Sequence, residues 1–436
     1  MGLAQVARRK GRLRYMRTAS AENENGTVYM GDTFGQSDAC KHIILTGQDT
    51  IFAAPGATPS ELRGWSPNPG WPKVLLYFNG THHPTGTPAS PPAGLEEAAY
   101  IRSSNATTKY LRTGEGSGNW LMDPTNEKWI LSRIEAAQSY VAAGYDGIFV
   151  DVMGWAPVTQ GRYEANADGT DVAGSGQYAP YNARTGTAWT KKQWLDAVVH
   201  LGHRVAGGIY AAAGNPVILL NGLGNGLRYY DAAAPTSQRL DLGNGMAEIW
   251  RRDADDTPST FPSESLWGQH LDMLLDATTK GRFIFCLTKL WRTDATQADL
   301  DLWFRFGTAS FLLGADGRHV WEWFGDTTTG GANMQRSAQN HDNGISYDAD
   351  WDLALGRRVS AYSVIASAKV GGTNIYRANY ERGVSLVNPT AAATNGYALG
   401  GSYQRASARL VPTGTPSGTI TTIDMPAHEA AVLLKT

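Results

Sequence analysis

The segment from residue 119 to residue 155 constrains the fold more than any other part of the chain, because it combines an amphipathic helix with a short buried strand. Asp123 is a candidate N-cap, and Pro124 follows in the first turn, where its missing N–H costs nothing. Apolar residues then recur at helical spacing on one face, at Ile130, Ile134, Ala137 and Val141. The segment predicts a helix that packs against a sheet.

A glycine, an apolar run and an acid follow this helix. Gly144 stands where a left-handed C-cap residue is needed. Ile148–Val150 is uninterrupted and apolar, which is typical of a parallel strand covered on both faces, and Asp151 comes directly after it. In β/α enzymes the chemistry takes place at the carboxyl ends of such strands. We therefore predict that Asp151 belongs to a functional site.

Strand-like runs recur between residues 12 and 325, and from the third onward they alternate with helical patterns. This alternation predicts a parallel α/β architecture, and the number of runs favours a closed (β/α)8 TIM barrel over an open sheet. The expected strands are Arg12–Arg17, Lys41–Leu45, Lys73–Phe78, Ile148–Val150, Pro216–Leu220, 245–250, Arg282–Leu287 and His319–Phe324.

Three regions flank or interrupt this barrel, which we place at residues 11–350. Residues 1–10 form a flexible basic arm, and residues 155–189 form a Gly-, Ala- and Tyr-rich insertion. From 355 to 436 the helical periodicity disappears, and short strands separated by Gly, Pro and Asn predict a small all-β antiparallel sandwich. Its expected strands are Asn374–Tyr380, Val384–Val387, Ala408–Val411, Thr419–Ile423 and Glu429–Leu434.

Composition argues against several classes of partner. The net charge of −2 and the lack of a nucleic-acid motif give no reason to expect nucleic acid. No run approaches the ~20 apolar residues that cross a bilayer, and the N-terminus lacks the apolar region of a secretory signal.

Cys40 and Cys286 are too few for a disulfide framework or a metal knuckle, so we expect no metal or other cofactor. The cellular location, and attachment of the basic arm to a larger particle, stay open.

Two acids on different strands suit the cleavage of a glycosidic bond. That reaction needs one carboxyl group to attack or to activate water, and another to protonate the leaving oxygen. Asp151 after the fourth strand and Glu248 in the sixth meet this need, with Glu322 and Asp231 in reserve. Either acid could instead form an ion pair, and Arg251 stands close to Glu248.

Other residue types fit the same chemistry. The chain has 14 Trp and 19 Tyr, whose aromatic faces can stack on sugar rings. A serine triad is disfavoured, because no GxSxG motif occurs. Five side chains at or near strand ends are candidate sugar contacts, namely Tyr77, Asn221, Lys289, Trp321 and Glu322.

Several motifs give the chain a family resemblance. The run WLMDPTNEKW…GYDGIFVDVMG, the loop NGLGNG and the strand GMAEIW resemble glycoside hydrolases with a barrel like that of endo-α-1,4-polygalactosaminidase. The C-terminal IYRANYERGVSLVNPT and MPAHEAAVLL are similar to the β module that closes many of them. The likeness covers residues 73–436. One difference is Tyr145, which stands where the family's strand motif usually has Phe. It implies that Asp151 acts as nucleophile or base and Glu248 as general acid.

Hydrolysis of a polysaccharide, such as a microbial cell-wall or capsular glycan, is the leading prediction. One alternative is a non-catalytic glycan-binding or virion-associated structural protein that retains the barrel. The other is glycosyl transfer of the amylase type. Asn221 argues against it, because that type places a Glu at the end of the fifth strand.

Overall fold

A computed structural model divides the chain into two compact units. Unit 1 comprises Met1–Lys73, Gly224–Leu227 and Met246–Thr436, and unit 2 comprises Val74–Leu223 and Arg228–Gly245. The structure describes residues 27–29, 50–53, 59–60, 73–113, 118–154, 156–159, 162–173, 176, 178–213, 216–223, 244–247, 250, 256–279, 284–290, 292, 294–314, 320–325, 355–360 and 364–436.

Unit 2 is built on three parallel strands that the sequence predicts. β3 (Lys73–Asn79), β7 (Gly147–Asp151) and β11 (Val217–Asn221) are hydrogen-bonded in the order β3-β7-β11. Leu76 and Ile218 both lie opposite Ile148, so the strands are in parallel register. The apolar run of β7 is buried, as expected for a strand covered on both faces.

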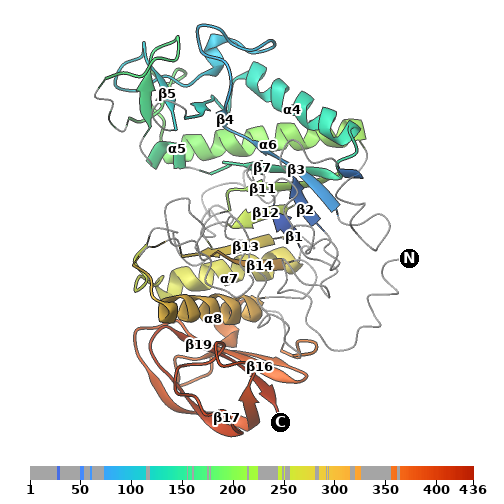
Figure 1. Ribbon diagram of the computed structural model, residues 1–436, viewed down its shortest axis with the longest axis vertical. Helices are drawn as coiled ribbons and strands as arrows, with labels where there is room; N and C mark the ends of the chain where they lie inside the picture. Colours follow the sequence, from blue (N-terminus) through green and yellow to red (C-terminus); the bar gives the residue numbers. More distant parts are fainter. Residues whose placement is uncertain are drawn as a thin grey trace. The chain divides into compact units, whose positions relative to one another are not determined.

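Two helices connect these strands. α4 (Glu127–Ala142) precedes β7 and α6 (Lys191–Ala213) precedes β11, and they lie side by side (Figure 1). Gln138 Nε2 of α4 donates to Gly208 O of α6 at 2.9 Å. Trp194, Val198, Leu201 and Val205 follow helical spacing on one face of α6 and are all buried.

The start of α4 differs from the prediction, whereas its end agrees. The N-cap is Asn126, whose side chain accepts from Trp129 N at 3.1 Å. The prediction of Asp123 as the cap is wrong, because Asp123 Oδ1 instead accepts from Thr125 N and Oγ1 in a local turn before the helix. Gly144 has the predicted left-handed conformation, with φ of 96°.

A small antiparallel sheet joins two distant segments of unit 2. β4 (His82–His83), β6 (Trp120–Leu121), β5 (Tyr110–Arg112) and β8 (Tyr163–Ala165) lie in the order β4-β6-β5-β8. The first three precede α4 in sequence, whereas β8 belongs to the 155–189 insertion. The insertion is therefore part of a sheet. Short elements of the same two segments are η2 (Glu97–Ala99), α5 (Ala156–Thr159), β9 (Tyr181–Asn182) and β10 (Thr187–Ala188).

Unit 1 repeats the alternation of strands and helices. β13 (Ile284–Lys289) and β14 (Val320–Gly325) pair in parallel, and α8 (Gln297–Gly314) connects them. Unit 1 also contains β1 (Thr27–Tyr29), which pairs in parallel with β2 (Thr50–Ala53), and α7 (Glu264–Thr279). β12 (Asn244–Ala247) begins in unit 2 and ends in unit 1. The expected strands Arg12–Arg17 and Lys41–Leu45 lie outside the described residues, as does the basic arm at 1–10. A mixed α/β architecture is confirmed, and closure of the barrel stays a prediction.

The C-terminal module is a single five-stranded antiparallel sheet. Its strands are β15 (Tyr376–Tyr380), β16 (Gly383–Asn388), β17 (Thr394–Arg405), β18 (Ile420–Met425) and β19 (Glu429–Lys435), in the order β15-β16-β19-β17-β18. The short helix η6 (Ile365–Ala368) precedes them. The expected antiparallel strands are confirmed in part, but their hydrogen bonds form one sheet and not the two sheets of a sandwich. The expected strand Ala408–Val411 is wrong, because those residues form a turn.

One face of this sheet packs on α8. Arg305 of α8 and Glu429 of β19 form a buried ion pair, with Nη2 and Oε2 2.7 Å apart. Ser385 Oγ donates to Ala309 O at 2.8 Å, and Tyr380 OH donates to Leu312 O. The sheet and α8 thus share one hydrogen-bonded interface. Among the described residues, no helix combines the length and apolar character that crossing a bilayer requires.

Candidate active site

The candidate site lies at the carboxyl ends of β3, β7 and β11 in unit 2. Asp151 is the last residue of β7, and Asn79, the last residue of β3, lies opposite it. Asn221 ends β11 and is 7% exposed, whereas Asp151 is half-buried. The buried apolar parts of three strands therefore deliver polar side chains to one edge of the sheet.

Two neutral donors orient the carboxylate of Asp151. Asn221 Nδ2 and the backbone N of Val152 both donate to Oδ1, each at 2.7 Å. Both donors are uncharged, and together they fix the direction of the carboxylate. Such an acid is held in place and stays able to act as a nucleophile or base.

The residue after Asp151 has a strained backbone. Val152 has φ of 57°, a left-handed conformation that a β-branched residue rarely adopts. Its neighbours hold it there: Thr81 Oγ1 donates to Val152 O at 2.9 Å, and Met153 N donates to Asn221 O at 2.9 Å. Strain of this kind, about 1–3 kcal/mol per residue, gathers at functional sites, where the surrounding structure maintains it.

We expect Val152→Gly to raise the free energy of unfolding by about 1 kcal/mol. Glycine removes the left-handed strain but loses more entropy on folding, and the first effect is the larger. The control is Val364→Gly, because Val364 is exposed and has an ordinary φ of −54°, so that only the entropic loss applies. Chemical denaturation of both variants tests this. A lower stability for Val152→Gly than for Val364→Gly would contradict the strain.

Two buried tryptophans hold the loops on either side of Asp151. Trp129 Nε1 of α4 donates to Gly80 O at 2.9 Å, and Trp194 Nε1 of α6 donates to Gly154 O at 3.0 Å. Gly222, after β11, leaves no room for a side chain, since a Cβ there would lie 2.5 Å from Met153 O. Helices, glycines and strand ends together fix the backbone around the acid.

Two histidines of β4 stand beside this edge. Burial, and second the charge of Arg162, lowers the pKa of His82 to about 3. Burial, and second the charge of Arg133, lowers the pKa of His83 to about 4, and its ring lies 5.5 Å from that of Trp129. Both imidazoles are therefore neutral at pH 7 and add no positive charge near Asp151.

The other predicted site residues are placed only in part. Tyr77 lies in β3, Lys289 ends β13, and Trp321 and Glu322 lie in the first half of β14, but their side chains are outside the described residues. Glu248 and Asp231 lie outside them entirely, although β12 ends at Ala247. The structure thus brings together Asp151 and Asn221 of the predicted set.

Sequence reasoning missed the contacts that support the acid and its loops, which are made by Thr81, Trp129, Val152 and Trp194. Most of them join segments that are distant in the sequence and leave no local signal. Among the described residues, no group of three or more His, Cys, Asp or Glu side chains is arranged to hold a metal ion.

No protein-family model matches the sequence, and no curated protein matches it. Similar solved structures include Amy13B of Eubacterium rectale, at 10% identity, 97% of each chain and a TM-score of 0.49. The glycoside hydrolase domain of PelA from Pseudomonas aeruginosa matches 69% of this chain and 93% of its own, at 10% identity and a TM-score of 0.36. A GH31 dextranase of Flavobacterium johnsoniae matches 98% of this chain and 52% of its own, at 13% identity and a TM-score of 0.46. At these values the similarities define neither the fold nor the function of this chain.

Proposed function

We propose that the protein is a glycoside hydrolase that cleaves a polysaccharide, with Asp151 as nucleophile or base. The observation that carries the proposal is the Asp151 carboxylate, half-buried at the end of a buried strand and oriented by Asn221 and Val152 at 2.7 Å. An acid held in one orientation beside a strained residue is suited to attack on a sugar carbon or on water.

Glu248 is the proposed general acid. In the sequence, Glu248 comes directly after Ala247, the last residue of β12. Asp151 likewise comes directly after the apolar run of β7. A second carboxyl group is needed because the leaving oxygen must be protonated. The distance between the two carboxyl groups decides the stereochemistry: about 5–5.5 Å for retention and about 6.5–9.5 Å for inversion.

The substrate class is tested by incubating the full chain with bacterial cell-wall, capsular and fungal polysaccharides and measuring new reducing ends. We expect release from at least one glycan, and NMR of the first product then distinguishes retention from inversion. Binding to a glycan without release from any would contradict hydrolysis and favour the non-catalytic binding protein.

A further inference from the structure

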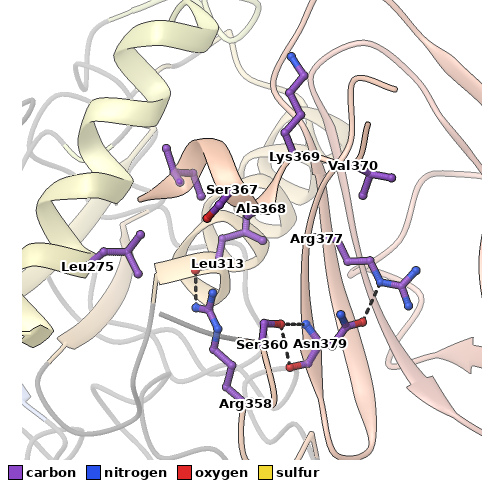
Figure 2. A pocket seen from close by; sticks show the side chains of 11 residues that line it. Leu275, Leu313, Arg358, Ser360, Ser367, Ala368, Lys369, Val370, Arg377 and Asn379 are labelled. Carbon is purple, nitrogen blue, oxygen red and sulfur yellow. Dashed lines mark hydrogen bonds between the residues drawn. The ribbon is translucent and has the colours of Figure 1, made fainter. Parts of the chain in front are cut away.

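Unit 1 contains a cavity of about 370 Å³, and the described residues that line it all belong to that unit. The cavity lies between β15 on one side and the ends of α7, α8 and η6 on the other (Figure 2). Its volume falls in the lower part of the range of small-molecule sites and suits a ligand about the size of a sugar ring.

The two sides of the cavity differ in character. Leu275, Leu313 and Ile365 make an apolar side. Ser360, Arg377 and Asn379 make a polar side, and Figure 2 shows Ser360 hydrogen-bonded to the Asn379 backbone and Arg377 directed at the Asn379 side chain. None of the described residues that line the cavity is aromatic, so none of them can hold a sugar ring by stacking.

The lining is cationic. Its described residues include Arg358, Lys369 and Arg377 but no acidic residue. Glu264, outside the lining, pairs with Lys369. Arg377 is half-buried, and a half-buried cation without a counter-ion is costly, so its charge favours an anionic ligand.

Arg377 carries a charge that its neighbours leave uncompensated. Its Nε donates to Asn379 Oδ1 at 2.8 Å, and its Nη1 donates to Leu399 O at 2.9 Å and to Tyr397 OH at 3.3 Å. Its Nη2 donates to Tyr403 OH at 3.2 Å. All four partners are neutral, and no carboxylate of a described residue pairs with it. Because a guanidinium has five N–H groups, one remains on Nη2.

Asn379 presents further donors on the same side. It lies two residues from Arg377 on β15, so both side chains are on one face of the strand. Asn379 Oδ1 accepts from Arg377 Nε. This contact fixes the orientation of the amide group, so that Nδ2 is a donor at its other end. Within the described residues nothing accepts from Nδ2. The pair therefore offers a row of donors and a positive charge, which is the complement of a carboxylate.

We propose that this cavity is an accessory binding site for a small carboxylate ligand. Arg377 and Asn379 would bind the carboxylate, and a ring or aliphatic body would lie against Leu275 and Ile365. The shared chemistry is a carboxylate on a body of hexose size, supplied either by an acidic sugar or by a non-sugar carboxylic acid. The proposal does not depend on the hydrolase function.

Ligand binding to the full chain, measured by calorimetry or saturation-transfer NMR, tests this site. Three probes are compared. Glucuronate has both a carboxylate and hydroxyl groups, glucose lacks the carboxylate, and cyclohexanecarboxylate lacks the hydroxyl groups. We expect glucuronate to bind at least tenfold more tightly than glucose. Asn379→Asp should weaken glucuronate binding at least tenfold, because it places an acid beside Arg377 while the Oδ1 contact is kept. Asn395→Asp makes the same charge change on an exposed residue of β17 and should have no effect.

The outcomes separate the two sources. Binding of glucuronate alone supports an acidic sugar, and equal binding of cyclohexanecarboxylate supports a general carboxylate site. Glucose binding as tightly as glucuronate, no binding at about 10 mM ligand, or undiminished binding to a folded Asn379→Asp would each overturn the proposal. If Asn379→Asp does not fold, Val370→Glu, which adds an acid to the half-buried wall, replaces it with the same expected loss.

Discussion

Replacing Asp151 with Asn is expected to slow glycan cleavage at least ~10³-fold, the scale of removing a catalytic group. Asn has nearly the same shape as Asp, and its Oδ1 can still accept from Val152 N and Asn221 Nδ2. The edge of the sheet therefore keeps its geometry and loses the charge and nucleophilicity of the carboxylate. The initial rate of reducing-end release measures the effect, and the melting temperature should change little.

Asp196→Asn is the matched control for Asp151→Asn. Asp196 lies on α6 and forms an exposed ion pair with Lys192 at 2.8 Å, so its loss should leave the rate unchanged. If Asp151→Asn were as active as the wild type, the assignment of Asp151 would be wrong. If both variants lost activity together, the effect would be one of stability.

Replacing Glu429 with Gln should destabilise unit 1 by about 3–5 kcal/mol. Glu429 and Arg305 are each 6% exposed, and their two hydrogen bonds tie β19 to α8. Gln has the same size but no charge, so the substitution leaves the Arg305 guanidinium buried without a counter-ion. Urea unfolding of the full chain measures the loss.

Two further variants separate this buried pair from ordinary surface pairs. Glu381→Gln removes the partner of Arg357, whose side chain is 89% exposed, and should cost at most about 1 kcal/mol. Arg305→Met combined with Glu429→Leu should recover most of the stability, because apolar residues of similar volume can replace a buried ion pair. Equal losses for Glu429→Gln and Glu381→Gln would contradict the account.

The α/β core was predictable because its signals are local. The apolar run before Asp151 and the helical spacing of Trp194, Val198 and Leu201 each specify an element within a few residues. The sheet that joins β8 to β5 was not predictable, since its pairing links segments about fifty residues apart through contacts that leave no periodic pattern. The cap of α4 was misplaced because Asp123 and Asn126 are both good caps, and a local turn used the first.

β17 was missed because its glycines resemble loop residues. Gly396 and Gly400 have φ of 61° and 73°, and the register with β18 shifts near them. Glycines at such positions mark β-bulges inside a strand and not its end. Conversely, Leu410 and Val411 are buried as an apolar run suggests, but they lie in a turn.

In the candidate site, Asp151 and Asn221 were predictable because each ends an apolar strand. The strain at Val152 was not, because it depends on Thr81 and on Asn221 O, which approach it only in the folded chain. The sequence thus identifies the acid, and the fold identifies what orients it.

The central claim is that Asp151 acts directly on the sugar, and azide rescue of Asp151→Ala tests it most directly. The substrate is the polysaccharide from which the wild-type protein releases reducing ends. Azide is a small anionic nucleophile that can occupy the space of the missing carboxylate. If Asp151 faces the reacting sugar carbon, azide should restore cleavage and the product should be a glycosyl azide. No rescue of Asp151→Ala, together with rescue of Glu248→Ala under the same conditions, would contradict the role assigned to Asp151.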